Sequence, residues 1–257
     1  MMILKRYKNF YSKYGFIKTL KRLITKPVRI INKNKSDKEF VKKKEMIFKL
    51  TSLKEKFEYI HSTNFWPSGE SISGPGSELK NTKNIRNGIK NLIEDYKINK
   101  ILDAPCGDFN WMKFIINKNI DYVGGDIVKE IVFQNLEKHR KKNVNFIELD
   151  VIKNNIPEAD LFICRDCLIH FSISNIKKFF ENVKKSNINY ILLTSYESKT
   201  QEFNKDIEDG DFRPIFLRQT PFNLPTPILK IFDKDEEHKN NSNLSCYLYL
   251  YSKNQLN

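Results

Sequence analysis

The sequence lacks the features of several large classes of protein. No apolar run approaches the ~20 residues of a membrane-spanning helix, and lysines interrupt the N-terminal stretch, so neither a span nor a secretory signal is expected. Only four cysteines occur in 257 residues, too few for a disulfide scaffold, which predicts a cytoplasmic protein. Apolar residues still make up 40% of the chain, which is enough for a packed domain.

The positive charge lies almost entirely at one end of the chain. Residues 1–50 hold 16 Lys and Arg against 3 Asp and Glu, whereas the remaining residues hold 29 against 28. We therefore expect a basic helical extension over residues 1–62 and a nearly neutral domain over residues 63–257. A nucleic-acid partner is not expected, because the basic residues are not spread over the domain.

The beginning of this extension combines basic and apolar residues. Residues 1–35 have the pattern of an amphipathic helix, and residues 33–44 are polar and charged, which predicts a hinge. Three interpretations of residues 1–35 stay open. They are peripheral contact with anionic lipid at the inner face of the membrane, docking of an acidic partner, and packing on the domain without a separate task.

Strand and helix patterns alternate at short spacing through the second half of the chain. We expect strands at 100–104, 122–126, 144–149, 159–165 and 190–195, and helices at 109–117, 129–140 and 175–185. This alternation predicts a doubly wound, Rossmann-like α/β fold with a parallel sheet. Residues 244–252 alternate as a late antiparallel strand, and the proline-rich residues 211–228 predict an ordered loop over the carboxyl edge of the sheet.

Two further helices are expected ahead of the sheet. Apolar residues recur at helical spacing over residues 45–61 and 78–96. Between them, residues 64–77 are rich in glycine, serine and proline, which predicts a loop.

Acidic residues follow three of the predicted strands. Asp103 ends the first strand and opens a tight turn with Gly107, where backbone and a ligand can approach closely. A carboxylate there would repel a pyrophosphate and suits a ligand with an ammonium or sulfonium charge. Asp126 ends the second strand, where an acidic side chain accepts hydrogen bonds from ribose hydroxyls. Asp150 follows the third strand, either beside an adenine amino group or as a plain turn residue.

These acids and their spacing resemble the class I S-adenosylmethionine-dependent methyltransferases. Of the three glycines usual in the turn of that family, Gly107 is present, with Pro105 and Phe109 at the other two places. The resemblance implies S-adenosylmethionine (SAM) as the cofactor. It also implies a cofactor site made by the turn and the strand ends: Asp103, Pro105, Gly107, Asp126, Ile127, Asp150 and Val151.

A narrower resemblance covers residues 65–229 and the last strand. The stretches SGESISGPGSELKNTKNIR, LDAPCGDFNWM, DLFICRDCLIHFS and FRPIFLRQTPFNLPTPI are similar to bacterial methyltransferases of surface-polysaccharide pathways. Some of these relatives belong to capsule clusters that make O-methyl phosphoramidate or O-methyl sugar groups. The resemblance implies a small or saccharide-type acceptor that is methylated on oxygen.

The fourth predicted strand ends in ionisable residues, which are the default catalytic candidates. His170 is suited to take the proton of an acceptor hydroxyl, and Asp166 can orient it or act as the base itself. The alternative is that His170 caps the next helix and Asp166 is structural. Cys164 and Cys167 lie in a buried strand without a second such pair, so no metal site is expected.

Several other residues are candidates for contacts with ligands. Arg165 and Arg86 are expected to contact the cofactor, and Arg86 can pair with its carboxylate. Trp66 is expected at the acceptor, by stacking or by wedging the loop. Arg213 and Arg218 can bind a phosphate or uronic-acid group through the guanidinium fork, or form surface ion pairs.

The sequence therefore predicts a SAM-dependent O-methyltransferase. Two rival functions stay open. An RNA or DNA methyltransferase is favoured by the basic extension, but CRDCLIH stands where base-amino methylases carry an Asn-Pro-Pro-aromatic run. A non-catalytic scaffold with this fold would dock other enzymes and show no turnover.

Overall fold

The computed structural model describes residues 37–200, 202–233 and 243–256 of the chain. These residues form two compact units, 37–46 and 47–256, and each is considered by itself. Residues 37–49 are helical, so the hinge expected over residues 33–44 is wrong for residues 37–44. The amphipathic helix predicted for residues 1–35 lies outside the described residues.

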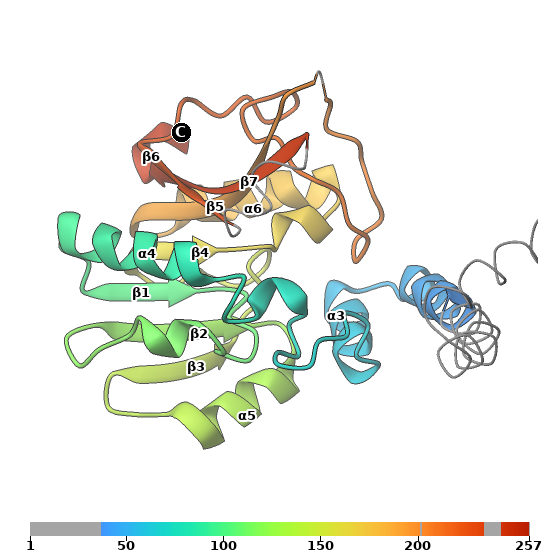
Figure 1. Ribbon diagram of the computed structural model, residues 1–257, viewed down its shortest axis with the longest axis horizontal. Helices are drawn as coiled ribbons and strands as arrows, with labels where there is room; N and C mark the ends of the chain where they lie inside the picture. The colour runs from blue at the N-terminus through green and yellow to red at the C-terminus, as the bar shows by residue number, and fades with distance from the viewer. Residues whose placement is uncertain (1–36, 201, 234–242, 257) are drawn as a thin grey trace, which may run out of the picture. The chain divides into compact units, whose positions relative to one another are not determined.

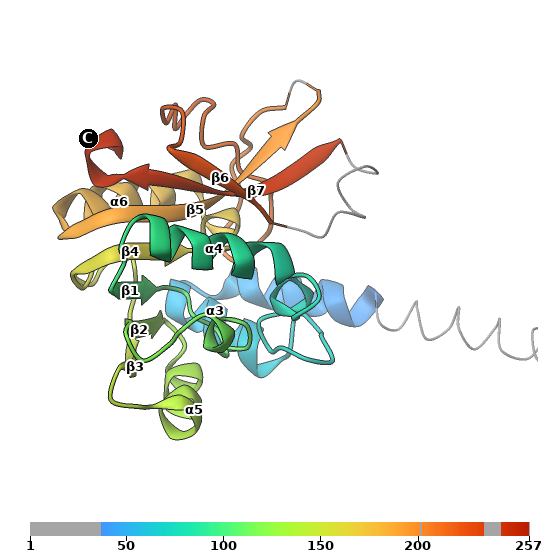
Figure 2. The same cartoon turned by 60° about the vertical axis from the view of Figure 1, so that its left-hand side comes forward.

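A seven-stranded sheet forms the centre of the larger unit (Figures 1 and 2). Its strands are β1 Lys100–Asp103, β2 Asp121–Asp126, β3 Val144–Glu148, β4 Ala159–Cys164, β5 Ile188–Ser198, β6 Leu229–Phe232 and β7 Leu244–Ser252. Their order is β3-β2-β1-β4-β5-β7-β6, in which β1 to β5 run parallel and β7 runs antiparallel to both β5 and β6. The strand order reverses between β1 and β4, where doubly wound sheets open a crevice at their carboxyl edge.

Helices cover both faces of the sheet, which confirms the doubly wound prediction. On one face lie α4 (Lys83–Asp95) and α5 (Lys129–His139), where Ile89 packs in the same core as Tyr122 and Phe146. On the other face, α6 (Ile173–Lys185) packs with the loop around Ile215 and with the strands. These apolar layers hold the strand ends, and the side chains on them, in fixed positions.

The helix predicted over residues 45–61 is two helices. The first ends at residue 49, and α3 spans Leu53–Ser62. Ser52 separates them, because its hydroxyl accepts from the Glu55 amide while the Glu55 side chain accepts from the Ser52 amide. Leu53 packs in the same hydrophobic core as α6, on one face of the sheet, so α3 belongs to the unit that contains the sheet.

Two other differences concern short elements. The helix predicted over residues 109–117 is wrong, because only a 3-10 turn, Met112–Phe114, forms there. The strand β6 was not predicted, since its four residues are too short for a clear pattern. In the described part of the chain, no helix has both the length and the apolar character needed to cross a membrane.

Candidate active site

Two buried carboxylates stand at the carboxyl ends of β1 and β2. Asp103 is 2% exposed and accepts a hydrogen bond of 2.8 Å from the Tyr122 hydroxyl. Asp126 is 4% exposed, and its two oxygens accept from the amides of Gly107 at 3.1 Å and Val128 at 3.0 Å. Among the described residues, neither carboxylate forms an ion pair with a lysine or arginine.

Burial governs the protonation of this pair. Loss of water raises the pKa of Asp103 to about 7, although the Tyr122 hydroxyl and the more distant Arg165 charge lower it. Burial likewise raises the pKa of Asp126 to about 6, against the effect of the backbone amides. A ligand that brings a positive charge or hydroxyl donors to these two carboxylates would therefore stabilise their charged forms.

The turn after β1 has the backbone shape that a ligand cradle needs. Gly107 has φ +54°, and a Cβ atom added there would lie 2.1 Å from the Ser73 hydroxyl oxygen, so any other residue would have to displace the Ser73 side chain. Phe109 also has a left-handed φ of +56°, and its ring packs 4.8 Å from the Tyr122 ring and 5.3 Å from the Phe146 ring. The side chain of Phe109 thus points into the core and leaves the turn clear. Pro105 follows a cis peptide bond.

Arg165, at the end of β4, is enclosed by acidic groups. Its guanidinium is 8% exposed and contacts both oxygens of Asp233, at 2.8 and 3.0 Å, and one oxygen of Asp166 at 3.2 Å. A further bond of 3.0 Å goes to the Gly76 carbonyl. Burial lowers the pKa of Arg165, but Asp166 and Asp233 raise it by more, so it stays charged. Arg165 therefore organises this part of the site through protein contacts.

Asp166 has an unusual backbone conformation for a non-glycine residue, with φ +51°. Its amide donates to the Thr194 hydroxyl oxygen at 2.8 Å, and this hydroxyl donates back to the carboxylate at 3.3 Å. Possible ligand atoms of Asp166, Asp233 and Cys246 lie within 4.8 Å of one another. Because the Arg165 guanidinium already places a positive charge in contact with both carboxylates, we assign no metal to this cluster.

His170 lies in a 3-10 turn, Leu168–His170, between β4 and α6. Its Nδ1 donates to the Asp211 carbonyl at 2.7 Å, which leaves Nε2 as the basic nitrogen. The Trp66 ring stacks on the imidazole at 4.6 Å. Burial lowers the pKa of His170, so the ring is neutral near pH 7. The cap of α6 is the Ser172 hydroxyl, so the structure gives His170 no capping role.

The other three arginines that were candidates for ligand contacts have different surroundings. On α4, Arg86 donates from Nη2 to the Leu79 carbonyl, while its buried Nε has no partner. Arg213 is 5% exposed, and its guanidinium donates to the carbonyls of Lys205, Leu168 and Phe171. Arg218 is exposed and donates to the Thr226 hydroxyl. Arg213 therefore holds the loop, and we leave it out of the proposed acceptor site.

The residues after β2 and β3 lie at the same edge of the sheet. The Asp150 carboxylate accepts from the Ile152 amide at 2.9 Å and lies 3.8 Å from the Lys153 ammonium, so it does act as a turn residue. The side chain of Val151 is buried in the core, and Ile127 packs against that core. Any contact of these two residues with a ligand would therefore come mainly from their backbone.

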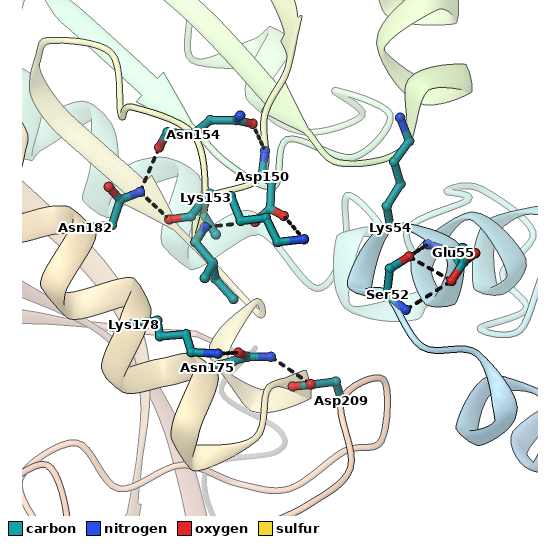
Figure 3. A network of polar contacts seen from close by, with 12 residues as sticks. Ser52, Lys54, Glu55, Asp150, Lys153, Asn154, Asn175, Lys178, Asn182 and Asp209 are labelled. Carbon is teal, nitrogen blue, oxygen red and sulfur yellow. Dashed lines mark hydrogen bonds and ion pairs between the residues drawn. The ribbon is translucent and has the colours of Figure 1, made fainter.

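A polar groove of about 570 Å³ lies between the start of α3, the turn after β3 and the exposed side of α6. Figure 3 shows polar groups on its three walls, with Ser52, Lys153, Asn175, Lys178, Asn182 and Asp209 among the lining residues. At one end, Asn175 donates to Asp209. The next residue, Gly210, donates its amide to the His170 carbonyl at 2.8 Å. The groove thus ends beside the segment that carries His170.

The comparisons with known proteins identify the fold. No protein-family model matches the chain, and a search of curated proteins finds no match. Among solved structures, the chain is similar to a SAM-dependent methyltransferase from Leishmania major, with 16% identity, a TM-score of 0.57, and coverage of 79% of this chain and 87% of that one. The chain therefore has the Rossmann-like fold of that methyltransferase.

Two other solved structures are less similar. One is the methyltransferase domain of bacterial Hen1, at 8% identity and TM-score 0.48, covering 66% of this chain and 100% of that one. The other is human N-acetylserotonin methyltransferase in complex with SAM, at 14% identity and TM-score 0.45, covering 64% and 50%.

Proposed function

We propose that this protein is a SAM-dependent methyltransferase that methylates a hydroxyl oxygen of a small or saccharide-type acceptor. The observation that carries the proposal is the pair of buried carboxylates, Asp103 and Asp126, at the carboxyl edge beside Gly107. In the described residues, these carboxylates have no ion-pair partner of their own, whereas the buried Asp233 at the same edge is paired with Arg165. A ligand with a positive charge and ribose hydroxyls supplies what they lack.

The groups around the glycine turn fit the parts of the cofactor. Asp126 can accept from the ribose hydroxyls with its remaining lone pairs, and Asp103 faces the positive end of the ligand. The partnerless Nε of Arg86 is a donor that suits the cofactor carboxylate. Asp150 and the backbone of Ile127 and Val151 are placed to contact the adenine side. When bound, SAM supplies an electrophilic methyl group on sulfonium.

His170 is the proposed general base. Its Nε2 takes the proton of the acceptor hydroxyl as the new oxygen–carbon bond forms and the carbon–sulfur bond breaks. The Asp211 carbonyl fixes the required tautomer, and the neutral imidazole is ready to accept a proton at neutral pH. Asp166, about one-third exposed at the end of β4, is proposed to orient the acceptor. A general base contributes a factor of roughly 10²–10⁴, and positioning contributes the rest.

The saccharide-type acceptor is supported by the groove beside α6. Its walls carry amides, lysines and carboxylates, which are groups that hydrogen-bond to sugar hydroxyls and to attached anionic groups. The resemblance to methyltransferases of capsule clusters supports the same class, and with it a role in surface-polysaccharide modification. Arg218 remains a proposed acceptor contact.

Titration of S-adenosylhomocysteine by calorimetry tests the cofactor site. We expect micromolar binding by the wild type, about −8 kcal/mol. Asp126→Asn should weaken it about 10- to 100-fold, because hydrogen bonds to a charged acceptor are worth about 1.5–3 kcal/mol. Asp121→Asn, at the exposed other end of β2, is the matched control. Equal affinity in all three proteins, or no binding by the wild type, would contradict the proposal.

A further inference from the structure

The loop segment of residues 66–76 is hydrogen-bonded to the turn around Gly107 and Asp108, which we call the glycine turn. We call this loop segment the strap. The Asp108 carboxylate accepts from the Ser71 hydroxyl at 2.9 Å and from the Ile72 amide at 3.0 Å. The Asp108 amide donates to the Ser73 hydroxyl oxygen at 3.3 Å, so this hydroxyl lies directly over Gly107. One residue of the turn, Asp108, thus makes three hydrogen bonds to the strap.

The other parts of the strap touch the acceptor side of the site. The Gly76 carbonyl accepts from Arg165, and a Cβ atom added at Gly76 would lie 3.5 Å from the Asp166 carboxylate. Trp66 stacks on His170 with an interplanar angle of 29°. Gly74, with φ +93°, brings the chain back against Trp66, where an added Cβ atom would lie 3.0 Å from the Trp66 Cβ. The strap therefore joins the glycine turn to the imidazole within one short segment.

We propose that Trp66 and Asp108 are positioning residues, with Trp66 fixing the His170 ring and Asp108 fixing the strap that carries Trp66. The conformation of the glycine turn then influences His170. If the strap loses its hydrogen bonds to Asp108, the Trp66 indole also loses its fixed position against the imidazole. The inference deepens the proposed function, on which the role of His170 as base rests. Trp66 was expected to stack on a ligand or to wedge the loop, and in the structure it stacks on His170.

The surroundings of His170 make the effect measurable on the ring itself. The Asp211 carbonyl holds Nδ1, the Trp66 ring covers one side, and the Phe212 ring lies 6.0 Å away. The charged groups near the imidazole are Asp166, Asp211 and Arg213. Without the indole, water reaches the ring, so the protonated form is favoured, and the ring is free to turn away from the Asp211 carbonyl that sets its tautomer.

Nuclear magnetic resonance of the histidine rings tests the coupling without a substrate. The chain has four histidines, and His170→Gln assigns the relevant signals. We expect the wild-type ring to be the Nδ1–H tautomer. Trp66→Ala should raise the His170 pKa and mix the tautomers, whereas Trp66→Phe should keep the wild-type pKa and tautomer. A merely structural tryptophan would leave the His170 pKa and tautomer of the folded variant unchanged, which would overturn its positioning role.

Asp108→Asn is the decisive variant, because Asp108 makes no contact with His170. Coupling predicts the same direction of change as in Trp66→Ala, with Asp121→Asn as the control. Ser71→Ala removes one of the three bonds and should give a smaller change, which keeps the test valid if Asp108→Asn folds poorly. An unchanged His170 in both variants would overturn the coupling. The failure of the wild type to bind S-adenosylhomocysteine would instead overturn the proposed function, so the two failures are distinguishable.

Discussion

The two halves of the carboxyl edge treat buried charge in opposite ways. At the ends of β1 and β2, Asp103 and Asp126 are held by a tyrosine hydroxyl and by backbone amides. At the ends of β4 and β6, Asp166 and Asp233 surround the buried guanidinium of Arg165. The carboxylates of the first half have no ion-pair partner, whereas those of the second half both contact one buried guanidinium, which balances one of the two negative charges.

This difference indicates which half receives the charged part of a ligand. A buried carboxylate without a cation is raised in pKa by the loss of water, and a cationic ligand relieves that penalty. A buried ion pair has already exchanged water for its partner, and it resists being opened. The first half is thus suited to bind SAM, and the second half is suited to hold the strap in place through the bond from Arg165 to the Gly76 carbonyl.

The largest expected effect on stability comes from breaking the buried ion pair between Arg165 and Asp233. Asp233→Asn removes the charge that faces two nitrogens of Arg165, and we expect the free energy of unfolding to fall by about 4 kcal/mol. Glu197→Gln is the matched control, because the Lys230–Glu197 pair is also 2.8 Å long but is partly exposed, with side chains 49% and 36% exposed, and pairs at the surface contribute at most about 1 kcal/mol. Urea unfolding measures both, and equal losses would show that burial does not distinguish these pairs.

The buried carboxylate of Asp103 at the end of β1 predicts an unusual dependence of stability on pH. The pKa of Asp103 is raised to about 7, above the unfolded value near 4, so its stabilising contribution is complete below about pH 4 and is lost as pH rises to about 7. Asp103→Asn removes this loss. Relative to the wild type, the variant should gain of the order of 3 kcal/mol between pH 4 and pH 8.

Urea unfolding of both proteins across this pH range measures the difference. Asp121→Asn removes a carboxylate from the same strand and controls for net charge. A gap between Asp103→Asn and the wild type that does not change with pH would contradict the prediction. Saturating S-adenosylhomocysteine, which carries the ribose but no sulfonium, should reduce the gap less than SAM does.

Two arginines of the loop after β5, Arg213 and Arg218, allow a buried structural charge to be compared with an exposed one. Arg213→Ala leaves three carbonyls without their donor, two of them buried, and we expect a loss of about 2 kcal/mol in the free energy of unfolding. Arg218→Ala removes an exposed side chain and should change stability by less than about 0.5 kcal/mol. Urea unfolding of the two variants tests this, and the reverse order would mean that their surroundings have been misassigned.

The sequence was sufficient for the parts of the site that follow directly from strand ends. Apolar runs locate β1 and β2, and parallel strands bring their carboxyl ends to one edge, so Asp103 and Asp126 could be predicted. Asp233 could not, because β6 is only four residues long and the acidic run after it has no distinguishing pattern. Its partnership with Arg165 depends on β6 lying at the far edge of the sheet, beyond β7.

Side-chain direction was the second limit of the sequence. Arg213 and Arg218 look alike in the sequence, and only the orientation of nearby carbonyls separates them. The stacking of Trp66 on His170 likewise depends on how the loop after α3 returns to the sheet. The helix expected over residues 109–117 failed because Gly107 and Phe109 both adopt left-handed conformations that interrupt a helical start.

The smallest expected effect concerns the groove beside α6, where the charge stays in solvent. Lys178→Ala removes a lysine from its wall, whereas Lys177→Ala removes an exposed neighbour that does not line it. For a uronic-acid oligosaccharide, calorimetry should show the dissociation constant rising about threefold in Lys178→Ala only, since an exposed charge contributes less than about 1 kcal/mol. The difference should shrink as ionic strength rises, and a neutral oligosaccharide should bind both variants equally. Equal weakening by both variants would assign the effect to net charge, and the groove would then lose its place in the acceptor site.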